Sequence, residues 1–189
     1  MNQEYVAESF EDKEFSEAEL ESVLFEDCTF VNCRFQDLEI LKSIFRNCDF
    51  VQCSWTNISM DEVKFQESRF QGGSIIGLRL NHGLVPIWEL AIQDSKLQYC
   101  MWEEMNLTTC KWTGSQILEC NFYDCNLTAV SFEGSRLTGS EFERCVLNKA
   151  NFADAEGYEF NPWENPVAGA TFSSPAVLAL LKPLQIEIR

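Results

Sequence analysis

Nine cysteines, one histidine and two of the adjacent pairs of carboxylates are the residues of this 189-residue chain whose types and spacing could support chemistry. Thiolates and imidazoles bind zinc or act as nucleophiles, and neighbouring carboxylates can share acid and base roles. The histidine is His82, and the carboxylate pairs are Asp61 with Glu62 and Glu103 with Glu104. The cysteines are Cys28, Cys33, Cys48, Cys53, Cys100, Cys110, Cys120, Cys125 and Cys145.

The elements that must position these groups follow a period of five. A large apolar residue recurs at every fifth position, and a small residue stands two positions before it. One series runs from Phe10 to Leu80 and a second from Ile87 to Phe152, which gives 15 and 14 units. A period of five fits neither the 3.6 residues of a helical turn nor the two of a strand. The chain is therefore predicted to be a solenoid whose large and small residues point inward.

Every cysteine occupies the small inward position of its unit. A metal or redox site would use residues outside this structural position, so the cysteines are interpreted as small packing residues. His82 lies where the two series change phase and is interpreted as a bulge residue. The repeat fixes no base beside a nucleophile, the sequence has no phosphate-binding glycine loop, and the carboxylate pairs lie on a convex surface. The sequence thus predicts no enzyme, cofactor or metal site.

The two series also set the expected domain boundaries. Residues 1–9 show no repeat and are predicted to be a lead-in, while 10–80 and 85–154 are predicted to be two β-helical lobes. Two extra residues and a glycine predict a bulge or kink at 81–84. Residues 155–189 are predicted to form the cap that an open solenoid needs.

The cap has its own local signals. Ser174 and Pro175 indicate an N-cap and a first helical turn, with a helix over 176–182 that Pro183 ends. Residues 184–188 alternate like a strand. The surplus of apolar residues predicts that the cap also joins a second copy of the chain; these residues are Val177, Leu178, Leu180, Leu181, Ile186 and Ile188.

Composition limits the classes of partner. With 46% hydrophobic residues the chain can bury one sizeable core, no apolar run approaches the roughly 20 residues of a membrane span, and the N-terminus lacks the features of a signal peptide. A soluble, cytoplasmic protein is expected. The formal charge is −16, from 30 acidic and 14 basic residues. Such a charge argues against nucleic acid or anionic lipid as a partner, and its simplest reading is a solubilising surface.

The pattern resembles the pentapeptide-repeat family, whose units favour a small residue, then Asp or Asn, then Leu or Phe. The units at 120–122, 125–127 and 150–152 match closely (Cys-Asn-Phe, Cys-Asn-Leu and Ala-Asn-Phe), and the resemblance covers about residues 8–154. It implies a right-handed quadrilateral β-helix, an all-β fold with four units and 20 residues per coil. Residues twenty apart then stack in columns of like residues, such as Leu107, Leu127 and Leu147, which supports four sides independently.

Four sides also bear on the cysteines and the charges. Stacked pairs such as Cys28 and Cys48 would have Cα atoms about 4.8 Å apart, but parallel side chains and a reducing compartment disfavour disulfides. If the side through residues 20, 40, 60 and 80 continues through 102, 122 and 142, its net charge is −7, against −4, −1 and −1 on the others. Its acidic residues are Glu19, Glu21, Glu39, Asp61, Glu62, Glu103, Glu104, Asp124, Glu141 and Glu143.

This acidic stripe runs along a rod of about seven coils, or roughly 34 Å. Duplex DNA of that length carries about 20 negative charges, so a groove built for DNA would attract the stripe. Within the family, the two out-of-phase lobes and the tail from Glu156 to Ile188 resemble the Qnr-type quinolone-resistance proteins and the microcin immunity protein that protects DNA gyrase. That resemblance implies a homodimeric DNA mimic that engages DNA gyrase or topoisomerase IV and relieves poisoning.

One departure from the Qnr pattern affects the predicted role. Many Qnr proteins carry protruding loops, whereas the interruption at residues 81–84 is small, so self-immunity or gyrase modulation fits at least as well as quinolone protection. The alternative hypothesis is a structural scaffold whose partner is not a topoisomerase.

Overall fold

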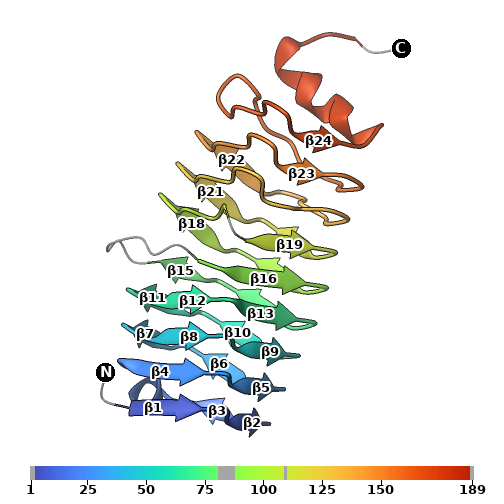
Figure 1. Ribbon diagram of the computed structural model, residues 1–189. Coiled ribbons are helices and arrows are strands. Elements are labelled where there is room, and N and C mark those ends of the chain that lie inside the picture. The colour runs from blue at the N-terminus through green and yellow to red at the C-terminus, as the bar shows by residue number, and fades with distance from the viewer. Residues whose placement is uncertain (1–2, 81–87, 109, 188–189) are drawn as a thin grey trace.

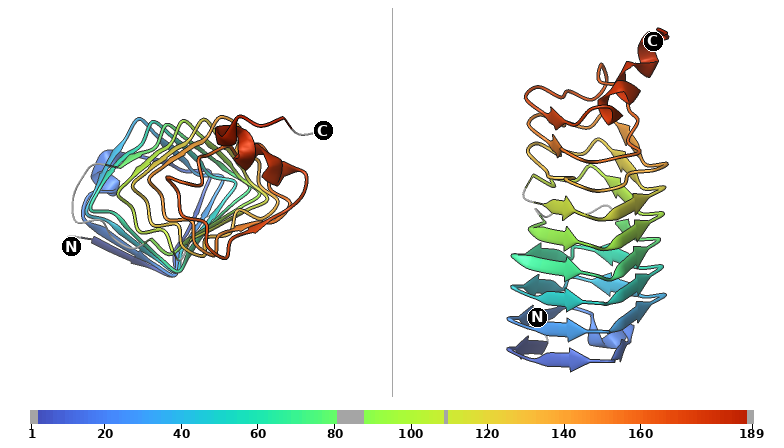
Figure 2. Two further views of the ribbon diagram at one scale, coloured as in Figure 1. Left: turned by 90° about the horizontal axis from the view of Figure 1, so that it is seen from above. Right: turned by 90° about the vertical axis from the view of Figure 1, so that its right-hand side faces the viewer.

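The structure is a computed structural model that describes residues 3–80, 88–108 and 110–187. These residues wind into a right-handed parallel β-solenoid of about 8 turns, with one short helix at the C-terminal end (Figures 1 and 2). Viewed along its axis the solenoid is four-sided (Figure 2). Residues twenty apart pair in parallel, as Phe25 does with Phe45. The predicted all-β quadrilateral β-helix is confirmed.

Each side is a ladder of short strands, one from each coil. The first side holds β1 (Gln3–Val6), β4 (Val23–Glu26), β8 (Ile44–Arg46) and β12 (Lys64–Gln66). The second side holds β2 (Ser9–Glu11), β5 (Thr29–Val31), β9 (Asp49–Val51), β13 (Ser68–Gln71), β16 (Leu90–Gln93), β19 (Lys111–Thr113), β23 (Asn151–Phe152) and β24 (Thr171–Phe172). The third side holds β3 (Glu14–Phe15), β6 (Arg34–Gln36), β10 (Ser54–Thr56), β14 (Ser74–Ile76), β17 (Lys96–Gln98) and β20 (Gln116–Leu118). The fourth side holds β7 (Glu39–Leu41), β11 (Ser59–Asp61), β15 (Arg79–Leu80), β18 (Met101–Glu103), β21 (Asn121–Tyr123) and β22 (Glu141–Glu143).

The corners between sides explain why Asn and Asp are frequent two residues after the large residue. The backbone there is left-handed, with φ of 55° at Asp27 and 48° at Asn47, and these residue types tolerate that conformation. The corner amides also bond to the coil before: Asn47 Nδ2 donates to Asp27 Oδ1 at 2.6 Å, and Asn57 Nδ2 donates to Asp37 Oδ1 at 2.9 Å. The five-residue period of large and small residues does not by itself indicate this turn.

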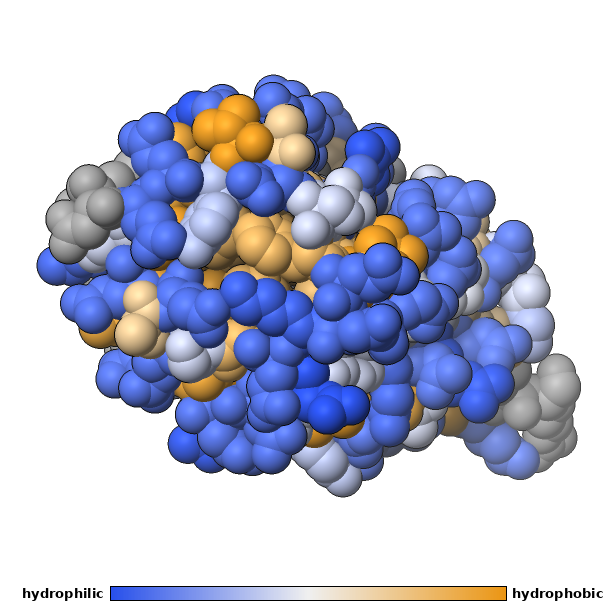
Figure 3. All heavy atoms as spheres, turned by 90° about the horizontal axis from the view of Figure 1, so that it is seen from below, coloured by the Kyte–Doolittle hydropathy of each residue, from blue (hydrophilic) through white to orange (hydrophobic). Residues whose placement is uncertain are grey.

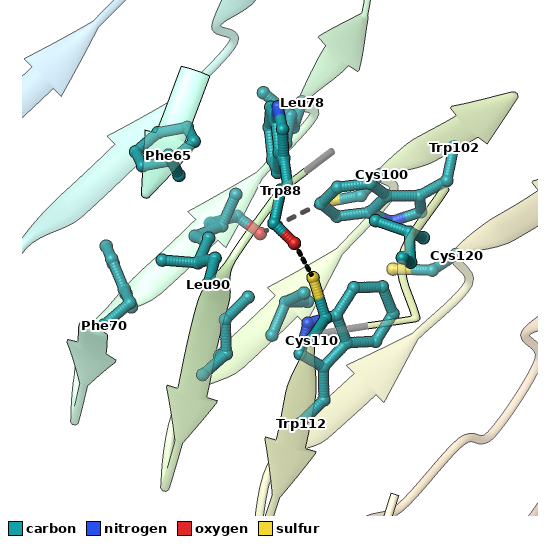
Figure 4. Close-up of a cluster of buried hydrophobic side chains, with 14 of the residues drawn as sticks. Phe65, Phe70, Leu78, Trp88, Leu90, Cys100, Trp102, Cys110, Trp112 and Cys120 are labelled. Carbon is teal, nitrogen blue, oxygen red and sulfur yellow. Dashed lines mark hydrogen bonds between the residues drawn. The ribbon is translucent and has the colours of Figure 1, made fainter. Parts of the chain in front are cut away.

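The core consists of columns of stacked large residues. In the N-terminal coils the columns are mostly phenylalanine, with ring centroids of Phe30 and Phe50 4.6 Å apart and nearly parallel. In the C-terminal coils, Trp102 and Trp112 join the phenylalanine columns, and within the described residues their indole N–H groups have no hydrogen-bond partner (Figure 4). Both regions bury their large residues almost fully, so the inward positions follow the five-residue rule throughout.

The small inward position joins neighbouring coils. All nine cysteines are buried and free, and the Cys48 thiol donates to the carbonyl of Phe25 in the coil before, at 3.5 Å. Burial raises the pKa of the Cys48, Cys53 and Cys110 thiols to about 12. A serine in this position makes a stronger bridge, as when Ser43 Oγ donates to the Leu20 carbonyl at 2.6 Å. The interpretation of the cysteines as packing residues is confirmed.

One coil has 22 residues instead of 20, because Phe70 pairs with Ile92 and Ile75 pairs with Leu97. The predicted bulge at 81–84, with His82, lies outside the described residues, as does Ile87. Trp88 packs on Phe65 at a centroid distance of 4.7 Å, and its Nε1 donates to the Val63 carbonyl at 3.1 Å (Figure 4). The sequence analysis assigned no core role to Trp88.

The N-terminal end begins earlier than expected. Strand β1 pairs with β4, and the Tyr5 ring stacks on Phe25 at 5.0 Å, so this part of the predicted lead-in belongs to the first coil. Seen from this end, the molecule shows an apolar centre surrounded by hydrophilic residues (Figure 3). Phe10 in this coil is only partly buried.

The cap differs from the expectation in three details. The helix η2 (Ala176–Leu184) is a 3₁₀-helix, Pro183 lies inside it, and it ends at Gln185 with left-handed backbone. Its N-cap residue is Pro175 and not Ser174, and no side chain caps it. Residues 185–187 form no strand, and Ile188 lies outside the described residues. A 3₁₀ turn bonds over three residues, which tolerates a proline near its end better than an α-helical interior does.

Within the described residues, no helix has the length and apolar character to span a membrane.

Candidate partner-binding surface

The fourth side carries the predicted acidic residues on one continuous surface. Strand β15 meets β18 across the 22-residue coil, where the Met101 amide donates to the Leu78 carbonyl at 3.0 Å. At the N-terminal end, the Ser22 amide donates to the Leu41 carbonyl at 2.8 Å, which joins the turn after the 3₁₀-helix η1 (Glu17–Glu19) to β7. We call this surface the acidic face, defined as the outward side of β7, β11, β15, β18, β21 and β22 with the preceding turn.

The register of the strands keeps like charges from pairing directly. Glu39 pairs with Ser59, which pairs with Arg79. In the second half of the face, Glu103 pairs with Tyr123 and Tyr123 with Glu143. Because like charges directly opposite each other destabilise a sheet, this alternation lets the face carry many carboxylates.

Arg144 partly neutralises the C-terminal end of the acidic face. It binds Asp124 through two bonds, Nε to Oδ1 at 2.8 Å and Nη2 to Oδ2 at 2.7 Å, and it also contacts Glu143. The hydrogen bonds from Arg144 lower the pKa of Asp124. Burial, and after it the charges of Glu141 and Glu143, raises the pKa of the Tyr123 phenol, which lies between them.

The N-terminal end of the face contains one carboxylate with a structural role. Glu19 accepts hydrogen bonds from the Ser16 amide at 3.0 Å and the Ser16 hydroxyl at 2.7 Å, and its Oε1 lies 2.8 Å from Lys13 Nζ. These partners, Lys13 foremost, lower its pKa to about 2. Glu19 therefore caps η1 and is held by a cation, whereas Glu62 makes only a long contact of 3.8 Å with Lys42.

Two exposed residues of the acidic face were not selected from the sequence. Tyr99 stands at the corner before β18 with 61% of its surface exposed, and Met101 in β18 is 44% exposed. The five-residue rule leaves their positions free, so only their size and apolar character could have drawn attention to them. Tyr99 lies at the corner between the third and fourth sides and Met101 lies on the fourth side, both close in sequence to Glu103.

The predicted dimerisation residues divide between two roles. Leu180 is buried against the core, and Val177 packs on the core from its margin. Leu181 is half-buried. Leu178 and Ile186 are exposed, by 41% and 56%, and Ile188 lies outside the described residues. The sequence analysis missed two further exposed apolar residues of the cap, Trp163 and Leu184.

Metal-ligand groups do not gather in the described part of the chain, where no group of three or more His, Cys, Asp or Glu side chains is placed to hold an ion. The acidic residues of the fourth side lie spread along a convex surface. This arrangement can attract an extended positive surface through many weak contacts.

Comparisons with known proteins address the fold. A family model described as pentapeptide repeats (8 copies) matches residues 125–156, and a model of the SV2A/B/C luminal domain matches residues 1–74. A comparison with curated protein sequences found no significant match. The four-sided solenoid and its five-residue units are thus similar to the pentapeptide-repeat family, whose model matches residues 125–156 of this chain.

Similar solved structures belong to several pentapeptide-repeat proteins. A trypsin-treated variant of QnrB1, a plasmid-mediated fluoroquinolone resistance protein, is 16% identical with a TM-score of 0.40, and each chain is covered fully. Full-length QnrB1 is 14% identical with a TM-score of 0.30, over 97% of this chain and 100% of that one. HetL, involved in heterocyst differentiation regulation in the cyanobacterium Nostoc sp. strain PCC 7120, is 12% identical with a TM-score of 0.46, over 92% and 87% of the two chains.

Proposed function

We propose that this protein is a DNA mimic that binds a bacterial type II topoisomerase, DNA gyrase or topoisomerase IV, and protects it from a quinolone, a microcin or a similar poison. The observation that carries the proposal is the acidic face, which is continuous from the turn before β7 to β22. The proposal does not rest on the solved structures above, whose similarity is too low to transfer a function.

The length and sign of the acidic face suit a groove built for DNA. Parallel strands repeat every ~4.8 Å, so successive coils place carboxylates in steps along a line of roughly 34 Å. A DNA-binding groove carries cations at the spacing of phosphates, which lie about one per 1.7 Å along a duplex. The whole chain, with its charge of −16, approaches the roughly 20 charges of that length of duplex.

The rigidity of the solenoid also supports the proposed role as a DNA mimic. Within the described residues, neighbouring coils are hydrogen-bonded to each other along all four sides, so the acidic side chains project from a frame that does not have to order on binding. A preordered frame lowers the entropy cost of association. A solubilising coat would need neither this frame nor the concentration of charge on one side.

We further propose that two copies join through the cap. Leu178, Leu184 and Ile186 are exposed near one another in sequence, and Trp163 adds a side chain that is 80% exposed. Exposed apolar groups of this size gain free energy when a second surface covers them. Two solenoids joined end to end would present a mimic about twice as long as one.

Purified protein and purified gyrase holoenzyme test the proposal. We expect the protein to inhibit DNA supercoiling in a concentration-dependent way and, at lower concentrations, to reduce the cleavage complexes that a quinolone or microcin traps. Topoisomerase IV is assayed in parallel by decatenation. A protein that binds neither enzyme and changes neither assay would contradict the proposal and favour a scaffold with another partner.

A further inference from the structure

The corner residue Tyr99 is an exception among the corners of the solenoid. Its backbone is left-handed, with φ of 56°, and 61% of its surface is exposed. A bulky side chain rarely adopts this backbone conformation, and among the described residues Tyr99 is the one aromatic that does. Corner positions elsewhere hold mostly Asn, Asp, Glu or Gly, so the repeat does not require a tyrosine here.

Packing does not account for Tyr99 either. The corner of the coil before is Gly77, whose amide donates to the Gln98 carbonyl at 2.8 Å, so that corner offers no side chain of its own to pack on Tyr99. The corner of the coil after is Glu119, because the Tyr99 amide donates to the Leu118 carbonyl at 3.1 Å. In the stack of corners, Tyr99 therefore stands between a glycine and a glutamate. Strained, exposed residues of this kind are more common at functional sites than in a structural frame.

Met101 extends this exposed surface onto the acidic face. It begins β18, is 44% exposed, and pairs in register with the polar Asn121. The other large apolar residues exposed in the described parts of the chain are Val6 in the first coil and four residues of the cap. Tyr99 and Met101 are thus the exposed apolar pair in the body of the solenoid, and they stand beside the carboxylates of Glu103 and Glu119.

We propose that Tyr99 and Met101 anchor the partner by taking a basic side chain, an arginine or lysine at the rim of the partner's DNA-binding groove. A mimic of phosphates alone needs carboxylates and gains nothing from an exposed tyrosine and methionine. An aromatic face flanked by carboxylates binds a guanidinium through both cation–π attraction and charge. Tyrosine, methionine and arginine are also enriched at protein interfaces, and tyrosine and arginine dominate their energetics.

This inference rests on the proposed function. Substitutions that leave the charge unchanged distinguish a failure of the anchor from a failure of the proposed function. In Tyr99→Asn the corner gains a residue type that other corners already hold, and Met101→Gln keeps the length of the side chain. Neither changes the net charge or the carboxylates. The matched control is Val6→Gln, which removes an equally exposed apolar residue from the first side, where Val6 is 54% exposed.

Affinity for the gyrase holoenzyme is measured by calorimetry at several salt concentrations. We expect the double variant Tyr99→Asn with Met101→Gln to bind at least tenfold more weakly than the wild type, with the same dependence on salt and an unchanged melting temperature, and Val6→Gln to bind normally. Wild-type affinity in the double variant would overturn the anchor and leave the proposed function standing. Absence of binding by the wild-type protein would overturn both.

Discussion

The acidic face and the second side, which lies opposite it, show two uses of the same repeat. On the second side most carboxylates are engaged within the solenoid. Asp49 binds Arg69 through two bonds of 2.7 and 3.2 Å, Asp154 accepts a bond from Ser173, and Glu133 accepts one from Asn151. On the acidic face, Glu21, Asp61 and Glu104 make no ion pair or side-chain hydrogen bond within the described part of the chain.

This difference shows that the five-residue rule does not decide where charge serves folding and where it serves a partner. Inward positions and corners are constrained identically on both sides. The outward positions are free on both, and the acidic face differs in carrying ten carboxylates against six on the second side.

The largest effect is expected from reversing charge on the acidic face. Replacing Asp61, Glu62, Glu103, Glu104 and Asp124 by lysine should weaken gyrase binding by 100-fold or more, since a positive groove would then meet positive charge. Circular dichroism and thermal melting check that the fold persists. The same number of reversals on the second side, at Glu11, Asp12, Asp94, Glu133 and Asp154, should leave affinity within a few-fold; equal losses in the two variants would contradict the distinction between the sides.

The next largest effect is expected in how the affinity for gyrase depends on salt concentration in the variants of the two sides. The affinity of the wild-type protein for gyrase should fall by about tenfold or more between 50 and 200 mM salt, as expected for contacts between many exposed charges. The acidic-face variant should lose most of this dependence, and the second-side variant should keep it. A wild-type affinity that does not vary with salt would argue against electrostatic mimicry.

Glu19 tests which carboxylates of the acidic face are free for a partner. Because Glu19 caps η1, Glu19→Gln should lower the free energy of unfolding by about 1 kcal/mol at pH 7 with little change in affinity for gyrase. Its folded-state pKa, about 2, lies below the ordinary value of 4.5, so the stabilisation is present above pH 4.5 and is lost as the pH falls toward 2. Urea unfolding at a series of pH values measures this; a difference between the proteins that grows on acidification would contradict the capping role.

The smallest effect concerns two matched ion pairs. Arg144 with Asp124 and Arg69 with Asp49 are both two-bond pairs between residues twenty apart. Arg144→Gln makes the acidic face more negative and should tighten binding to gyrase by two- to five-fold, whereas Arg69→Gln should not change it. Stability should change by less than about 1 kcal/mol in each, because exposed pairs contribute little. Tighter binding in both variants would indicate that net charge alone matters.

The sequence alone predicted the features that repetition encodes. The inward large residues, the inward cysteines and the stacking of residues twenty apart follow from a period that is restated in every coil. The continuity of the fourth side depended on whether the two extra residues at 81–84 lengthen one coil from 20 to 22 residues. The pairing of Phe70 with Ile92 shows a coil of this length.

Features that occur once could not be read from the period. Trp88 packs on Phe65 although the period points to Ile87, because the 22-residue coil departs from the rule locally. Tyr5 begins the first coil without a small residue two positions before it, so the period was not recognised there. Pro183 was expected to end a helix, yet a 3₁₀-helix accommodates it. The role of Glu19 depended on Lys13 and Ser16, which lie outside its own unit.

The most direct test of the central claim is competition with DNA itself. A labelled linear duplex is bound to gyrase holoenzyme and displaced by increasing amounts of the protein, with displacement followed by fluorescence anisotropy. Mimicry predicts complete displacement by the wild-type protein and by the second-side variant, and none by the acidic-face variant. A ternary complex of gyrase, duplex and protein, or displacement that survives reversal of the acidic face, would contradict the account.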